Sequence, residues 1–234
     1  MKLLLLSNST NAGEDFLEYS LFEIEKHLKN VKSTLFIPYA AVGSSYDSYF
    51  EMTSQRLSQI GIKVTSAHHY SSPNEAVIQA ESICVGGGNT FALLHKMQQL
   101  GLVEAISERV IQGVPYLGWS AGSNVTSPTI ATTNDMPIIE PESLNSLGLI
   151  PFQINPHYID TTIQGHAGES REQRIEEYLY LNRKRWVVGL REGTMLKVDG
   201  DDIHLLGDKT ARIFRYGETP RELSSKDSLQ FLLK

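Results

Sequence analysis

Short apolar runs alternate along the chain with segments in which apolar residues recur at helical spacing. Residues 3–6 (LLLL) and 34–37 (TLFI) are almost entirely apolar, which is typical of strands buried on both faces of a sheet. Between them, apolar side chains recur at steps of four, three and four residues, at Leu17, Leu21, Ile24 and Leu28. This stripe follows the 3.6-residue period of a helix, so the chain begins strand, helix, strand.

The same alternation continues through the first half of the chain. The pattern predicts a helix over 46–60, a weaker strand over 63–69, buried strands over 82–85 and 115–119, and a helix over 89–99. Strands that alternate with helices in this way form a parallel sheet with helices on both faces. We therefore expect a three-layer α/β fold with a mostly parallel sheet.

The last third of the chain changes character. A helix is expected over 168–181, and Ser170 and Gln173 could form its capping box. Short strands follow over 186–190, 194–198, 203–206 and 213–216, and Asp199-Gly200 is a strong hairpin signal. We expect these strands to extend one edge of the sheet as antiparallel hairpins. Because no linker or repeat interrupts the pattern, residues 1–234 are expected to form a single domain.

Composition narrows the setting in which the protein works. A chain of 234 residues can bury ~70% of the surface of its unfolded form. Its net charge of −6 gives no sign of a nucleic-acid or acidic-membrane partner. The single cysteine, Cys84, fits a reducing compartment. The N-terminal apolar run is too short for a secretory signal, and no stretch approaches the ~20 apolar residues of a membrane span. We expect a cytoplasmic protein.

One serine stands in a setting that suits a nucleophile. Ser120 lies within GWSAG, residues 118–122, directly after a predicted buried strand. The pattern G-x-S-x-G in that context indicates a tight strand-to-helix turn that holds the serine hydroxyl in the open. The alternative is a glycine-rich turn whose serine only caps the following helix.

A second glycine run, residues 86–88, follows another buried strand. A dinucleotide-binding G-x-G-x-x-G would need a third glycine where Phe91 stands, and no P-loop Gly-Lys pair is present. Glycines also let backbone N–H groups approach a reacting oxygen closely, as an oxyanion hole requires. Both glycine-rich turns fall at the carboxyl edge of the sheet, where ligands collect, so we favour the oxyanion interpretation.

Among the seven histidines, His157 is the best candidate for a base. It follows Pro156, which forces the preceding residue into an extended conformation at the end of a short strand. From there it could reach Ser120. His166, in a glycine-flanked loop, is the rival. The others are expected in helices or strands and are interpreted as structural: His27, His68, His69, His95 and His204.

Two carboxylates could orient the base. Asp135 lies in a polar loop before Pro137, and its alternative role is an Asx-type turn. Glu192 follows a predicted buried strand, and its alternative role is a surface ion pair with Arg191. We expect Glu192 to be the direct partner of His157, because a strand end fixes a side chain more firmly than a loop.

Taken together, these segments resemble one family. The chain is similar to peptidase E, the aspartyl dipeptidase family, in LLLLSNST (3–10), FIPYA (36–40), VGGGNTF (85–91), GWSAGSN (118–124), TTNDMPI (132–138), QINPH (153–157), GHAGESREQRI (165–175) and GLREG (189–193). Residues beyond about 195 match only loosely, and Ser123 departs from the family, which often has alanine there. The resemblance implies a fold like that of the class I glutamine amidotransferases.

The resemblance also implies an activity. It is the hydrolysis of dipeptides with an N-terminal aspartate, Asp-X, at the α-peptide bond, without a metal or cofactor. Ser120 matches the family's nucleophile and His157 its histidine. The third member of the triad matches either Asp135 or Glu192.

The remaining expected site residues bind the reacting groups. We expect the backbone N–H groups of Gly88 and Ala121 to hold the oxyanion. The carboxylate of the substrate's aspartate requires a cation, for which a guanidinium that binds in two places is best suited, and we expect Arg171 to supply it. Asn89 is a further expected substrate contact. The alternative for Arg171 is a solvated charge on a helix.

The sequence also fits two other functions. One is a related serine hydrolase of β-aspartyl or polymeric aspartate substrates such as cyanophycin, with the same triad and a different pocket. The other is a non-catalytic binding module that keeps the serine turn for a ligand. The expected partners are small peptides, with neither nucleic acid nor membrane; the sequence leaves a homodimer open.

Overall fold

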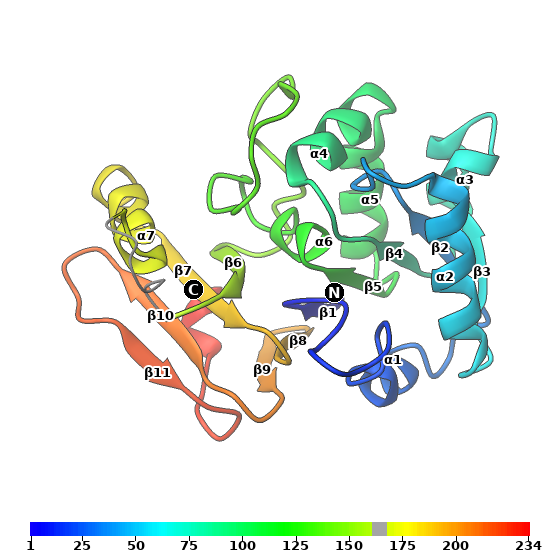
Figure 1. Ribbon diagram of the computed structural model, residues 1–234. Helices are drawn as coiled ribbons and strands as arrows, with labels where there is room; N and C mark the ends of the chain where they lie inside the picture. Colours follow the sequence, from blue (N-terminus) through cyan, green and yellow to red (C-terminus); the bar gives the residue numbers. More distant parts are fainter. Residues whose placement is uncertain (161–167) are drawn as a thin grey trace.

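A seven-stranded sheet forms the centre of the molecule in the computed structural model, which describes residues 1–160 and 168–234 (Figure 1). Its strand order is β3-β2-β4-β5-β1-β8-β9. The strands are β1 (Lys2–Leu6), β2 (Ser33–Ile37), β3 (Lys63–Ser66), β4 (Ile83–Val85), β5 (Tyr116–Trp119), β8 (Met195–Asp199) and β9 (Asp202–Leu206). Strands β3 to β1 are parallel, whereas β8 and β9 add an antiparallel hairpin beside β1.

Helices cover both faces of this sheet, as the apolar runs predict. The helices on this sheet are α1 (Leu21–His27), α2 (Tyr46–Ser58), α3 (Pro73–Gln79), α4 (Thr90–Gln99), α5 (Leu102–Ile111) and α6 (Ala121–Asn124), whereas α7 (Arg171–Leu181) covers a second sheet. Alternate residues of β1 point into two cores. Leu4 and Leu6 pack in the core shared with α1 and α2, and Leu3 and Leu5 pack in the core shared with α3, α4 and α5. The three-layer α/β prediction is confirmed.

The late strands divide between two sheets. Strands β8 and β9 extend the central sheet as expected, but the other two segments join a second sheet of order β11-β10-β7-β6. Its strands are β6 (Gln153–Tyr158), β7 (Trp186–Arg191), β10 (Ala211–Arg215) and β11 (Arg221–Leu223). The expectation that all the late segments would extend one edge was wrong for β7 and β10. Val187 packs against α7, and Val188 packs in the core shared with α3, α4 and α5, so both faces of β7 are covered. Strand β7 pairs with β6.

Two helices and one strand also differ from the predicted elements. Helix α3, which the pattern did not predict, begins with Pro73 after a Ser72 cap whose hydroxyl accepts from the Glu75 N–H. Helix α5 also escaped prediction. The strand expected over 63–69 ends at Ser66, and a short 3₁₀ helix, Ala67–His69, follows it. Within the described part of the chain, no helix is long and apolar enough to cross a membrane.

Candidate active site

Ser120 occupies the turn between β5 and α6. Its backbone angles, φ 53° and ψ −113°, are strained for a residue other than glycine. A Cβ on Gly122 would meet the Val85 carbonyl, and one on Gly118 would meet the Gly122 carbonyl, so both glycines are required by close backbone approach. The Ser120 side chain makes no capping hydrogen bond to α6. The geometry is that of a nucleophile elbow and differs from that of a helix cap.

His157 connects this serine to a carboxylate. Its Nε2 lies 2.9 Å from Ser120 Oγ, and its Nδ1 lies 2.7 Å from Glu192 Oε1. The carboxylate accepts a hydrogen bond from Nδ1–H, which leaves Nε2 as the acceptor for the serine hydroxyl. His157 also has a positive φ of 52°. The two residues in direct contact at the candidate site are thus both held in uncommon backbone conformations.

Two residues at the end of β1 hold His157 and the chain around Glu192. The His157 N–H donates to Ser7 Oγ at 2.9 Å, and the Ser7 hydroxyl donates to the Leu190 carbonyl at 2.7 Å. Asn8 Oδ1 accepts from the Gly193 N–H, directly after Glu192, at 2.9 Å. Sequence reasoning missed Ser7 and Asn8 as site residues, although both belong to the LLLLSNST segment that carries the family resemblance.

Glu192 is free to contact His157 because Arg191 has other partners. The Arg191 guanidinium pairs with Asp160 at 2.7 Å and with Glu222 at 2.8 Å. Although partial burial opposes its ionisation, hydrogen bonds led by that from Arg191 lower the pKa of Glu222 to about 2. The alternative in which Glu192 pairs with Arg191 is therefore not what the structure contains.

Asp135, the other candidate for orienting the base, contacts α4 instead. Its Oδ2 accepts hydrogen bonds from the Thr90 N–H at 2.7 Å, the Thr90 hydroxyl at 2.6 Å and the Thr133 hydroxyl at 3.1 Å. The expected distance of 2.6–3.2 Å between a carboxylate and the His157 ring is met by Glu192, and Asp135 directs its hydrogen bonds elsewhere. Asp135 still lines the pocket that contains Ser120 and His157.

Of the two expected oxyanion donors, Gly88 lines the same pocket, and Ala121 directly follows Ser120 in the chain. Gly88 has φ +137°, and a Cβ there would meet the Ala40 carbonyl, so only glycine fits. Ala121 is the first residue of α6, where the N–H has no partner inside the helix.

The side chain of Asn89, an expected substrate contact, makes hydrogen bonds within the protein instead. Its Oδ1 caps α4 at the Ala92 N–H, and its Nδ2 donates to the Met136 carbonyl at 2.9 Å. It therefore braces the Asp135 loop, and its amide is not free for substrate.

The pocket above Ser120 has a volume of about 570 Å³ and two kinds of wall. Ser9 and Thr10 add polar groups, while the apolar wall consists of Phe16, Tyr49, Met52 and Trp119. The Trp119 Nε1–H donates to the Tyr49 hydroxyl at 2.7 Å, which fixes the two largest rings of this wall. The apolar wall can pack against an apolar group of a bound ligand.

Arg171 opens onto a smaller neighbouring pocket of about 150 Å³, and Asp135 lines both pockets. Burial and the nearby charge of Arg174 lower the pKa of Arg171. Such crowding of cations favours an anionic ligand. The structure does not bring Arg171 into the lining of the Ser120 pocket itself. His166, the rival base, lies outside the described residues.

A serine on a strand-to-helix elbow, hydrogen bonded to an imidazole that is hydrogen bonded to a carboxylate, is the arrangement of the serine hydrolases. The sequence model of peptidase family S51 matches residues 3–206, so the chain belongs to this family. It is a peptide hydrolase of the serine dipeptidase type.

Curated relatives agree with this placement, and a solved structure shares the fold. The chain is 50% identical over 234 residues to peptidase E of Nostoc sp., with 100% of this chain and 97% of the relative covered. It is 45% identical over 218 residues to peptidase E of Salmonella arizonae, with 93% and 95% covered. A crystal structure of a peptidase from an acI-B1 actinobacterium is similar in fold, with a TM-score of 0.72 at 22% identity and 97% and 96% of the two chains covered.

Proposed function

We propose that this peptide hydrolase cleaves Asp-X dipeptides at the α-peptide bond through an acyl-enzyme formed on Ser120. One observation carries the proposal. The Ser120 hydroxyl donates to His157 Nε2 and His157 Nδ1–H donates to Glu192, so the three side chains form a continuous hydrogen-bonded chain that begins at the wall of a pocket. A serine hydroxyl becomes a nucleophile when a positioned base can accept its proton.

In the proposed reaction, Ser120 Oγ attacks the carbonyl carbon of the N-terminal aspartate while His157 Nε2 takes the hydroxyl proton. Glu192 stabilises the imidazolium that forms. The N–H groups of Gly88 and Ala121 hold the oxyanion, and donors of this kind contribute roughly 3–4 kcal/mol each when tested by removal. His157 then protonates the leaving amine. Water, activated by the same imidazole, hydrolyses the ester and restores the free serine.

Asp135 has a different role in this proposal, which is to bind the substrate's α-ammonium group. That nitrogen is two bonds from the carbonyl carbon under attack, within about 3 Å of it. An enzyme that reads a free amino terminus therefore needs an anion close to its nucleophile. Asp135 lines the Ser120 pocket, and Thr90 and Thr133 hold its Oδ2 in place.

Arg171 is proposed to bind the side-chain carboxylate of the substrate's aspartate. In an α-linked aspartate, this carboxylate and the ammonium group branch from neighbouring carbons. Their protein partners should therefore also be neighbours, and Asp135 and Arg171 line the same small pocket. The second residue of the dipeptide would lie against Phe16, Met52 and Trp119. An apolar X residue is therefore preferred.

The proposed setting follows from the site as a whole. Ser120 comes from the central sheet, whereas His157 and Glu192 come from the second sheet. We infer that residues 1–234 act as one catalytic unit. A cytoplasmic location, with small peptides as the partners, agrees with the single buried cysteine. Nothing in the proposed steps requires a second copy of the chain.

Hydrolysis of α-Asp-Leu, β-Asp-Leu and Asn-Leu by the wild-type protein tests the proposal. The expected order of kcat/KM places α-Asp-Leu far above the other two. Preference for β-Asp-Leu would instead support the β-aspartyl hydrolase. A chromogenic aspartyl ester adds a separate readout, because an acyl-enzyme releases the chromophore in a burst. Binding of α-Asp-Leu without hydrolysis or burst would point to a binding module.

A further inference from the structure

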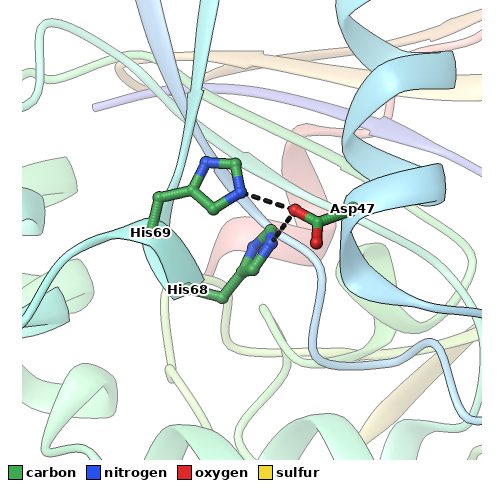
Figure 2. Close-up of side chains that lie close together, drawn as sticks. All are labelled: Asp47, His68 and His69. Carbon is green, nitrogen blue, oxygen red and sulfur yellow. Dashed lines mark hydrogen bonds and ion pairs between the residues drawn. The ribbon is translucent and has the colours of Figure 1, made fainter.

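Three metal-ligating side chains meet outside the Ser120 pocket (Figure 2). Asp47 lies in the first turn of α2, and His68 and His69 lie in the 3₁₀ helix that follows β3. Asp47 Oδ1 is 2.9 Å from His68 Nε2 and 2.6 Å from His69 Nε2. One ligand atom from each residue lies within 4.8 Å of the others.

We propose that Asp47, His68 and His69 bind one divalent transition-metal ion, and that Zn²⁺ fits this set best. Two imidazole nitrogens and one carboxylate oxygen are characteristic ligands of zinc. Tetrahedral coordination with bonds of about 2.0–2.2 Å places ligand atoms about 3.4 Å apart. The observed contacts need to widen by less than about 1 Å to admit the ion. Asp47 can move that far, since its side chain is 68% exposed.

A partner for the outer nitrogen of His68 supports this assignment. His68 Nδ1 lies 2.7 Å from the hydroxyl of Ser66, which is fully buried at the end of β3. Histidines that bind a metal through one nitrogen usually donate the other N–H to a nearby oxygen, which fixes the tautomer. When Ser66 Oγ accepts from Nδ1–H, the Nε2 lone pair of His68 faces Asp47 and can bind a cation.

Packing against α2 holds both imidazoles in place. The Tyr46 ring packs edge-on against His68 with centroids 5.5 Å apart, and Phe50 does the same to His69 at 5.1 Å. These aromatic residues stand one position before and three positions after Asp47 on the same helix. The two imidazoles therefore face the carboxylate before any ion arrives, which lowers the cost of ordering the ligands.

A metal-free cluster is the competing interpretation. Hydrogen bonds from His69 and then His68 lower the pKa of Asp47, and a carboxylate in the first turn of a helix is favourable without an ion. In that case Ser66 donates to His68 Nδ1 and both Nε2–H groups donate to Asp47. The two interpretations differ in the direction of the Ser66 hydrogen bond, and metal binding distinguishes them.

The ion would stabilise the fold without taking part in bond cleavage. It would join the start of α2 to the end of β3. The same helix carries Tyr49, whose hydroxyl donates to the Gly87 carbonyl at 3.1 Å in the wall of the Ser120 pocket. Binding would therefore brace one wall of that pocket from outside. This inference is independent of the proposed substrate and mechanism.

Titration of metal-free protein with Zn²⁺ against a chromophoric chelator tests the site. The titration is best performed in a His157→Gln background, because the imidazole of His157 beside Glu192 could otherwise bind a second Zn²⁺. We expect one Zn²⁺ per chain, and affinity at least tenfold lower for His69→Gln and for Asp47→Asn. His204→Gln, which removes an exposed imidazole from β9, should bind like its parent. Co²⁺ should give visible absorption bands in the parent and lose them in His69→Gln.

Thermal unfolding gives a second readout. Saturating Zn²⁺ should raise the Tm of the parent protein and of His204→Gln but leave that of His69→Gln unchanged. The proposal is overturned if no Zn²⁺ binds at about 0.1 mM. It is also overturned if His69→Gln and Asp47→Asn, shown by circular dichroism to be folded, bind as tightly as their parent. The metal-free cluster would be supported instead if the Tm of His69→Gln lies below that of its parent by the same amount with and without Zn²⁺, because Zn²⁺ then stabilises neither protein.

Discussion

The backbone N–H of His157 donates a 2.9 Å hydrogen bond to the side-chain hydroxyl of Ser7. Ser7 immediately follows β1 in the central sheet, and His157 belongs to β6 in the second sheet. The same hydroxyl donates to the Leu190 carbonyl, two residues before Glu192. One serine side chain thus ties the sheet that carries Ser120 to the strands that carry its two proposed partners.

Ser7→Ala should therefore lower kcat more than it affects substrate binding. Loss of the hydroxyl leaves a buried N–H and a carbonyl unpaired, at about 1–3 kcal/mol of stability. A small shift of the imidazole should lower kcat at least tenfold, because reaction rates fall steeply with misplacement. Kinetics with α-Asp-Leu and thermal unfolding measure the two effects. Ser82→Ala is the matched control. Ser82 directly precedes β4, and its hydroxyl donates to the Ser33 carbonyl. Wild-type kcat in Ser7→Ala would contradict this role.

Glu192→Gln and Asp135→Asn should separate the two carboxylates. Glu192→Gln leaves His157 without an anion to stabilise its charged form, so kcat should fall by roughly 10²–10⁴ with KM little changed. Asp135→Asn weakens binding of the α-ammonium group, so KM should rise with a smaller effect on kcat. Steady-state kinetics with α-Asp-Leu distinguishes the two patterns. The reverse pattern would return Asp135 to the triad.

Arg171→Ala should lower kcat/KM for Asp-Leu, because it removes a charged hydrogen-bond partner of the substrate. The loss corresponds to roughly 1.5–3 kcal/mol of transition-state binding, while the stability of the fold hardly changes. Arg174→Ala is the matched control, since Arg174 lines the same small pocket. The ratio of kcat/KM for Asp-Leu over Asn-Leu is the measurement. If that ratio is kept in Arg171→Ala and lost in Arg174→Ala, the carboxylate is read by Arg174.

Stability should depend on pH through His27. Burial lowers the pKa of His27 from 6.5 to about 4, against the opposing effect of its hydrogen bond to the Tyr116 carbonyl. The unfolded chain therefore binds this proton at higher pH than the folded one. The free energy of unfolding should therefore be unaffected by this group above about pH 6.5. It should fall by about 3 kcal/mol as the pH decreases from there to about 4. Urea unfolding across this range should show the slope in wild type and His204→Gln and a shallower one in His27→Gln. Equal slopes in all three would contradict the assignment.

The parts of the site set by local backbone geometry could be predicted from the sequence. G-x-S-x-G after an apolar strand specifies an elbow, and Pro156 marks an extended strand end directly before His157, because the residue that precedes a proline is restricted to extended geometry. The preference for Glu192 rested on the same reasoning about strand ends. Its hydrogen bond to His157 agrees with that prediction, while its catalytic role stays a proposal.

Contacts between distant segments could not be predicted. Ser7 and His157 are 150 positions apart, and nothing near either residue specifies the other. The second sheet was missed for a similar reason, because an apolar strand does not state which neighbour it pairs with. The Asp47 cluster likewise exists only because α2 packs beside β3, which brings a helix start next to the two histidines (Figure 2).

Turnover of α-Asp-Leu by Ser120→Ala tests the central claim most directly. The substitution removes one hydroxyl from a turn and should leave the fold and the Tm close to those of the wild type. The account predicts that kcat falls by at least about 10³-fold, since Ser120 is the one hydroxyl among the described residues that hydrogen bonds to the His157 imidazole. A folded Ser120→Ala protein that keeps more than about a tenth of the wild-type kcat would show that Ser120 is not the nucleophile.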